Sequence, residues 1–298
     1  MTWMAGFRGA GALLLFVLGV LVGAPAPAAG QDPAAIAVSD TLVQVRLTDG
    51  STLFGRVVAV EGDRVVLQTQ GGTRVELERA QIRSVSRVQG RVRGGQVLID
   101  DPHGTRLFFA PTGRSLAAGE GYFGVYELFF PFVTFGVTDR LVITGGTPVI
   151  PDAIGEFAYV GPKLLVFQGP RTSISAGVFT GFFEGGLAGI AYGVGTWGDT
   201  DNALTAGAGL AFHREDGEGD MADKPVFMLG GETRAGARTK FISENYFIPG
   251  ESGALVSGGL RFWGERLSAD AGVGLYVGDG DVGCCLPLVN FVYTFGKK

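Results

Sequence analysis

Segments of about ten residues in which every second side chain is apolar constrain the fold of this chain more than any other feature. In RLSADAGVGLYVGDGD, apolar Leu267 and Ala269 alternate with the polar Ser268 and Asp270. Because successive side chains of a β-strand point to opposite faces, this pattern predicts a strand with one apolar face. About 12 such segments follow residue 104, and the first two are predicted at 105–112 and 121–136. The apolar face must contact either a protein core or lipid.

The composition of the polar rows favours lipid as the partner of the apolar face. Charged residues make up only 18% of the chain, against about 25% in an average soluble protein. The rows opposite the apolar side chains are rich in glycine, of which the chain has 51. Strands that face water usually carry many more charges. Since lipid cannot satisfy open strand edges, strands that cross a membrane must close into a barrel.

The N-terminus has the layout of a secretory signal peptide. Arg8 precedes an apolar stretch from Gly9 to Gly23, and small residues and prolines follow. We predict a signal peptide over residues 1–30, with cleavage after Gly30. The alternative is an uncleaved membrane anchor, for which the apolar stretch is short.

Residues 38–90 predict a small β-module. Short alternating runs are separated by TDGS, EGD and QGG, and such Asp-Gly, Gly-Asp and Gly-Gly pairs favour the positive φ angles of hairpin turns. The stretches LTDGSTLFGRVV, GDRVVLQT and IRSV resemble an Sm-like or SH3-like barrel of four or five strands. Residues 91–104 are predicted to link this module to the strands that follow.

Arginines cluster where the module ends. Arg83, Arg87, Arg91 and Arg93 form a basic run, which is either a solvated surface or a contact site for an anionic partner. A periplasmic protein or an anionic envelope polymer, bound through residues 41–93, is therefore a candidate partner. Nucleic acid is not expected, because the net charge is −5 and no aromatic platform accompanies the basic residues.

The C-terminal segment resembles the end of bacterial outer-membrane barrels. LPLVNFVYTFGKK is similar to the aromatic final strand that the barrel insertion machinery reads, although here Gly-Lys-Lys follows the last aromatic, Phe295. Together with the strand pattern, this predicts an antiparallel up-and-down transmembrane β-barrel of about 12 strands at residues 105–298, surrounded by outer-membrane lipid. An even strand number brings both ends of the barrel to one side, which puts the β-module in the periplasm.

If the apolar rows face lipid, the opposite rows face the barrel interior. These rows contain four charged residues of each sign, and buried charge without a partner is unfavourable. A balanced set predicts ion pairs and a narrow or closed lumen rather than a wide, ion-selective pore. The predicted lumen-lining charges are Glu127, Lys163, Glu232, Arg234, Lys240, Glu244, Arg261 and Asp270.

These patterns predict an integral outer-membrane β-barrel that acts as a narrow pore or a structural envelope protein, with a periplasmic interaction module. One alternative is an outer-membrane lipid-modifying enzyme. His213 is the only histidine in the barrel region, but no Gly-x-Ser-x-Gly motif and no partner for Ser257 or Ser268 is visible. The other alternative is a soluble secreted β-barrel that binds a small apolar ligand. No catalytic residue, metal site or cofactor is predicted.

Overall fold

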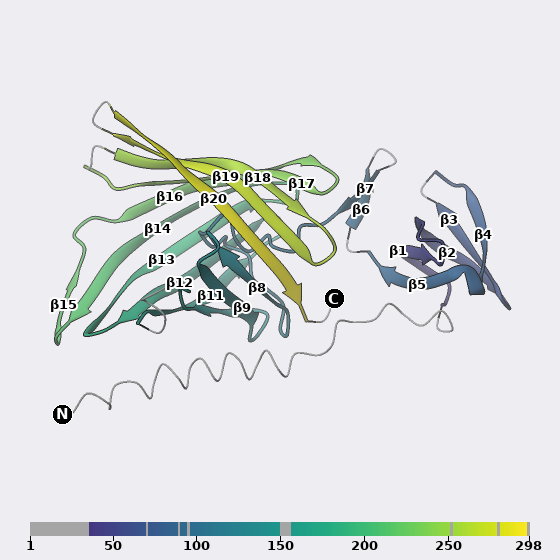
Figure 1. The fold of residues 1–298 in the computed structure, drawn as a ribbon, viewed down its shortest axis with the longest axis horizontal. Coiled ribbons are helices and arrows are strands. Elements are labelled where there is room, and N and C mark those ends of the chain that lie inside the picture. The colour runs from purple at the N-terminus through teal and green to yellow at the C-terminus, as the bar shows by residue number, and fades with distance from the viewer. Residues whose placement is uncertain are drawn as a thin grey trace. The chain divides into compact units, whose positions relative to one another are not determined.

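The protein forms two compact units, residues 26–100 with 236–238 and the rest of the chain from residue 101 (Figure 1). The computed structural model describes residues 36–69, 71–88, 90–93, 96–149, 156–250, 253–278 and 281–296. The predicted signal peptide lies outside these residues. Within them, no helix is both long enough and apolar enough to cross a membrane.

The first unit contains a five-stranded antiparallel sheet, the upper limit of the four or five strands predicted. Its strands lie in the spatial order β4-β3-β2-β1-β5. Glycines 50, 62 and 72 in its turns have φ angles of 89°, 59° and 84°, which explains why Gly stands in each predicted turn pair. The elements are β1 Ser39–Leu47, β2 Thr52–Glu61, β3 Arg64–Thr69, β4 Arg74–Glu78, the 3-10 turn η2 Arg79–Gln81, and β5 Ile82–Arg87.

The inward side chains of this sheet form a separate hydrophobic core, which includes the fully buried Val45, Val65 and Leu67. We expect Leu67→Ala to lower the free energy of unfolding of this unit by about 2–5 kcal/mol, because the substitution leaves a cavity. The barrel should keep its own heat stability, since the two cores share no residue. Limited proteolysis measures the stability of the first unit. The temperature at which the folded barrel band disappears from an unboiled gel measures the heat stability of the barrel. Equal loss in both units would contradict this independence.

The stretch predicted as a linker contains a hairpin. Strand β6, Gly90–Arg93, pairs with β7, Gln96–Ile99, in antiparallel register. Sequence reasoning missed it because four-residue strands are too short to give a clear alternating pattern.

The second unit is a closed antiparallel barrel of 12 strands, as predicted. Each strand pairs with its sequence neighbours, and the first and last strands pair with each other to close the sheet. A thirteenth strand, β15 Glu218–Met221, extends one hairpin beyond the barrel. The barrel strands are β8 Gly121–Tyr126, β9 Phe130–Gly136, β10 Leu141–Gly146, β11 Ala158–Gln168, β12 Thr172–Phe183, β13 Gly186–Gly198, β14 Asn202–Glu215, β16 Val226–Gly236, β17 Thr239–Phe247, β18 Gly253–Trp263, β19 Leu267–Gly278 and β20 Asp281–Phe295.

The apolar rows face outward and the polar rows face inward. On β19, Leu267 and Val273 are exposed, whereas Ser268 and Asp270, which point to the other face, are 1% exposed. Exposed outward side chains on the other strands include Leu164, Leu204, Leu229, Phe241, Phe262 and Phe291. The outward-facing rows of the described barrel strands therefore form an apolar outer surface.

Two predicted strands are wrong, and their errors cancel in the count. Residues 105–112 form no strand of the barrel. Residues 121–136 form two strands, β8 and β9, because Glu127 and Leu128 turn the chain with φ angles of 49° and 64°. Neither residue is a usual turn former at positive φ, so no local signal in the sequence marks this turn.

The barrel wall is low on one flank. Strands β8, β9 and β10 have 6, 7 and 6 residues, whereas β20 has 15. Strand β20 pairs with β8 only over Asn290–Phe295 among the described residues. Pro287 lies in the part of β20 beyond this pairing, where the missing N–H of proline is tolerated.

Candidate functional site

The segment between the two sheets lies inside the barrel. Residues 101–116, here called the inner segment, fold back on themselves through a bridge between Arg106 and Pro111 and a hydrogen bond from Leu107 N to Ala110 O of 2.9 Å. Arg106, Leu107 and Phe108 are at most 2% exposed. Because three consecutive side chains are buried, the segment is surrounded by the barrel on all sides rather than forming part of its wall.

An aspartate on the wall holds two arginines. Asp270 on β19 accepts hydrogen bonds from Arg261 on β18 (Nε–Oδ1, 2.7 Å) and from Arg106 on the inner segment (Nη1–Oδ2, 2.7 Å). Arg261 also contacts Asp101 Oδ2 at 3.1 Å and donates to the carbonyl oxygen of Leu107 at 2.6 Å. The inner segment is thus fixed to β18 and β19 by fully buried charge-assisted hydrogen bonds.

The ion pairs continue around the lumen. Lys240 on β17 contacts Asp101 at 3.3 Å and Glu232 on β16 at 3.0 Å. Glu232 in turn accepts a 2.5 Å hydrogen bond from Arg114 at the far end of the inner segment. Acidic and basic groups alternate along this chain of contacts. Each buried charge therefore has a partner of opposite sign, which offsets the loss of hydration in a low-dielectric interior.

Lys163 on β11 binds main-chain carbonyls of the inner segment. Its Nζ atom donates to the oxygens of Arg114 at 2.6 Å, Thr112 at 2.9 Å and Thr105 at 3.5 Å. No carboxylate among the described residues pairs with it. Lys163 therefore joins the two arms of the inner segment and ties both to the wall.

Glu244 on β17 binds the tip of the inner segment. Its Oε2 atom accepts hydrogen bonds from the main-chain N–H groups of Phe109 at 3.0 Å and Ala110 at 3.1 Å, and its Oε1 atom accepts one from Tyr246 at 2.6 Å. A buried carboxylate is thus satisfied by donors that a turn in the inner segment presents to it.

Seven of the eight predicted lumen-lining charges lie on the inner side of the strands. Arg234 on β16 is bonded to Asp201 in a turn, and its guanidinium lies over the ring of Trp263 at 5.1 Å. Glu127 is the exception. It lies in the β8–β9 turn, where its carboxylate accepts a hydrogen bond from Val289 N, so the strand alternation used to predict it does not apply there.

The sequence missed the charges that the inner segment contributes. Asp101, Arg106 and Arg114 lie in stretches predicted as a linker, a strand and a loop. The cluster DDPHGTR does carry four ionisable side chains within seven residues, which is unusual for the lipid-exposed part of a barrel. That density was the available sign of a buried polar segment.

Ser268 has a histidine partner that the sequence did not reveal. Its Oγ atom lies 2.8 Å from His103 Nδ1, and His103 Nε2 lies 2.9 Å from Thr294 Oγ1. Both ring nitrogens bind hydroxyls and none binds a carboxylate, and Ser268 and His103 are at most 1% exposed. The pair lacks both the orienting carboxylate and the substrate access that nucleophilic catalysis requires. His213, the histidine considered from sequence, is exposed on β14.

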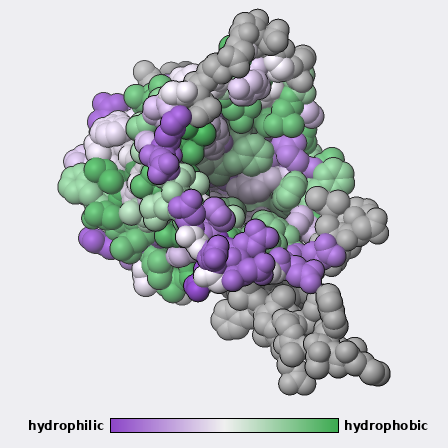
Figure 2. All heavy atoms as spheres, turned by 90° about the vertical axis from the view of Figure 1, so that its left-hand side faces the viewer, coloured by the Kyte–Doolittle hydropathy of each residue, from purple (hydrophilic) through white to green (hydrophobic). Residues whose placement is uncertain are grey.

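The inner segment fills only part of the barrel. It contacts the ends of the strands near the short turns 169–171, 199–201 and 264–266, here called the turn end. Figure 2 looks into the opposite end, here called the loop end, where β15 lies. A hollow opens there, with hydrophobic and weakly polar side chains inside and hydrophilic side chains gathered on its rim.

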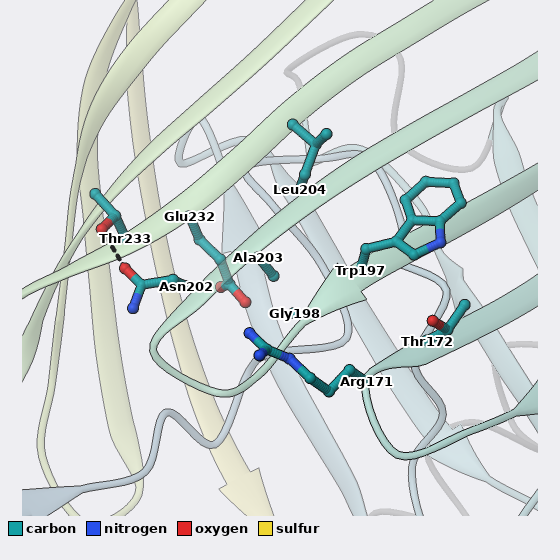
Figure 3. Close-up of a pocket in the computed structure, with 9 residues that line it drawn as sticks. All are labelled: Arg171, Thr172, Trp197, Gly198, Asn202, Ala203, Leu204, Glu232 and Thr233. Atoms are coloured by element: carbon teal, nitrogen blue, oxygen red, sulfur yellow. Dashed lines mark hydrogen bonds between the residues drawn. The ribbon is translucent and has the colours of Figure 1, made fainter.

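A second depression, of about 460 Å³, lies at the turn end. Figure 3 shows Arg171 reaching from the β11–β12 turn toward the β13–β14 turn, where its guanidinium lies 3.8 Å from Asp199. Glu232 also borders this pocket, but Arg114 and Lys240 already occupy its carboxylate. The charges of the pocket are thus already paired within the protein.

Comparisons with known proteins give only distant likenesses. No family model and no curated protein matches the chain. Among solved structures, a KdgM porin in complex with disordered oligogalacturonate is 9% identical, with 60% of this chain and 99% of that chain covered and a TM-score of 0.42. A NanC porin is 10% identical, with 61% and 100% covered and a TM-score of 0.39. OmpT, an outer-membrane protein of Vibrio cholerae, is 13% identical, with 85% and 94% covered and a TM-score of 0.34.

Proposed function

We propose that the protein is an integral outer-membrane β-barrel whose lumen is closed by its own inner segment, so that solutes pass only when this segment moves. The apolar outward rows support the membrane assignment. Soluble monomers rarely expose contiguous apolar patches larger than a few hundred Å², whereas here Leu204, Phe241 and Phe262 on three different strands are each about half exposed. A soluble ligand-binding barrel would bury these rows instead.

The ion-pair chain through the lumen carries the functional part of the proposal. Arg106, Arg114 and Asp101 of the inner segment bind four charged side chains of the wall. In width, a barrel of 12 strands lies between the small barrels filled by side chains and the open porins of about 16–18 strands. With the inner segment in its lumen, the barrel is a narrow or closed channel. Moving the segment out requires a substantial free energy, because many charged contacts must break.

The N-terminal sheet supports a periplasmic interaction module. Both ends of the barrel unit lie at the turn end, and short turns face the periplasm in outer-membrane barrels. The five-stranded sheet with η2 before its last strand suits the predicted Sm-like or SH3-like module. Arg83 and Arg87 are exposed there and are available to an anionic polymer or a periplasmic protein, whereas the side chains of Arg91 and Arg93 lie outside the described residues.

Conductance in planar bilayers tests the closed lumen. We expect the wild type to show no large, stable openings. Lys163→Met should raise the open fraction about tenfold or more, because hydrogen bonds to a charged group contribute about 1.5–3 kcal/mol each and the substitution removes the ammonium that binds three carbonyls. The matched control is Arg171→Met, which removes an exposed cation at the turn end and should leave the traces unchanged. Large, stable wild-type openings would falsify the proposal.

Acidification should favour opening. Burial and, to a smaller extent, the charge of Arg106 lower the pKa of His103 to about 3, although Asp101 opposes this shift. A histidine released to water titrates near pH 6.5, so the displaced segment binds a proton that the closed one does not. Closure is therefore fully stable above about pH 6.5 and weakens as the pH falls toward 3. We expect openings to become more frequent from pH 7 to pH 5, and His103→Gln to reduce this dependence. An identical pH profile in that variant would contradict the role of His103.

A further inference from the structure

The inward-facing side chains are buried near the turn end of the barrel and exposed to solvent near the loop end. On β12, Ser173 and Ser175 near the turn end are 6% and 1% exposed, whereas Phe179, further along the same inward row, is 39% exposed. On β20, Leu288 is 2% exposed and Leu286 is 53% exposed. The inner segment therefore covers the turn-end half of the lumen and leaves the loop-end half open to solvent.

The register establishes that these exposed side chains point into the barrel. Phe179 packs against Tyr159, with ring centroids 5.2 Å apart, and Tyr159 is 5% exposed on the inner face of β11. A Cβ placed on Gly161, the inward neighbour of Tyr159, would lie 3.0 Å from the Phe179 ring. The exposed surface of Phe179 thus faces the barrel interior and not the outside of the barrel.

The hollow is lined by rings and has a ring on its floor. Phe109 at the tip of the inner segment is 37% exposed, and its ring lies 5.1 Å from Tyr126, which stacks on Phe132 at 4.0 Å. None of the lining side chains that define it is charged. We call this hollow the aromatic cup, defined by Phe109, Tyr126, Phe130, Tyr159, Phe179 and Leu286.

The surroundings of the aromatic cup restrict what it can hold. The long strands border it at the sides, except above the low flank of β8 to β10, and the inner segment closes it below. Concave, mostly apolar surfaces with a few polar groups are typical of small-molecule sites. Rings add edge-to-face and offset-stacked contacts of about 0.5–1.5 kcal/mol for another ring, which a flexible acyl chain does not obtain.

We infer that the aromatic cup binds a small, uncharged aromatic molecule of one or two rings. Such a ligand would rest on Phe109 and between the Tyr159–Phe179 pair and Leu286. The site lies above the closed inner segment, so binding does not require the segment to move. A failure of this inference therefore leaves the conductance proposal untouched, and the reverse also holds.

Quenching of an introduced tryptophan tests the inference. Phe179→Trp protein in lipid nanodiscs is titrated with 1-bromonaphthalene, whose bromine quenches a nearby indole. We expect saturable quenching that unbrominated naphthalene relieves. The matched control is Leu164→Trp on the outer face, where quenching should rise without saturation and should not be relieved. The wild type, with Trp197 and Trp263 near the turn end, supplies the background.

Two further measurements separate the outcomes. In the Phe179→Trp background, Leu286→Glu should weaken binding by roughly tenfold or more, because a hydrated carboxylate in an apolar site keeps water where the ligand packs and is unfavourable against the negative face of a ring. Val149→Glu on the exposed loop end should not weaken binding. Naphthalene should also raise the unfolding temperature of the wild type, which keeps the test valid if the Phe179→Trp substitution perturbs the fold. Equal, unrelieved quenching at both positions would mean partition into lipid only, and relief by dodecanoate as strong as by naphthalene would mean an acyl-chain site; either result overturns the inference.

Discussion

Replacing Arg261 by methionine is expected to lower the free energy of unfolding by about 3–5 kcal/mol, the range found when one partner of a buried ion pair is removed. The loss is large because Asp270 and Asp101 both contact Arg261 at 3.1 Å or less and neither can reach water in its place. Asp270 keeps Arg106, but Asp101 keeps only Lys240 at 3.3 Å as a charged partner, together with the main-chain N–H of His103. The carbonyl oxygen of Leu107 also loses one of its two donors.

The temperature at which the folded band disappears from an unboiled gel, combined with urea unfolding in detergent, measures this effect. Arg140→Met is the matched control, since it removes an exposed arginine in the β9–β10 turn and should change stability by no more than about 0.5 kcal/mol. The double variant Arg261→Met, Asp270→Asn should recover part of the loss. Equal stability of Arg261→Met and the control would show that the buried network contributes nothing to the fold.

Replacing residues 103–114 by a flexible Gly/Ser stretch of equal length is expected to convert the barrel into an open pore, with conductance on the order of ten times the wild-type value or more, given the width of a 12-stranded barrel. The barrel should still assemble. Arg261 keeps Asp270 and Asp101, and Lys240 keeps Glu232, while water entering the lumen can hydrate Lys163 and Glu244.

Two controls make this result interpretable. A heat-shift gel shows whether the replaced chain is folded, and replacement of the loop stretch 222–225, outside the barrel strands, by Gly/Ser should leave conductance at the wild-type level. A folded variant that conducts no better than the wild type would mean that something other than the inner segment closes the lumen.

The wall of the barrel could be predicted from sequence because two-residue alternation is a local property. The apolar Leu267 is 55% exposed on the outside of the barrel, whereas its polar neighbour Ser268 is 1% exposed on the inside. The inward charges Lys163, Lys240 and Arg261 follow from the same alternation once the direction of the apolar rows is known.

The inner segment could not be predicted in this way because its partners are distant in sequence. Arg106 meets Asp270 across 164 positions, and nothing in RLFF distinguishes a segment buried on all sides from a strand with one apolar face. The short turn at Glu127 was missed for a different reason, since it uses positive φ angles without glycine or asparagine. Local patterns thus locate strands, whereas the filling of the lumen depends on tertiary contacts.

The low flank of the barrel has a consequence for the surrounding bilayer. At roughly 3.3 Å per residue, six or seven residues rise about 20–23 Å even without tilt, less than the ~30 Å of an average hydrocarbon core. Strands β8 to β10 are this short, whereas β14 and β20 have 14 and 15 residues. In a membrane, this hydrophobic mismatch compresses the lipid on one side only. The bilayer is therefore thinner beside β8 to β10 than around the rest of the barrel, and the protein distorts the membrane asymmetrically.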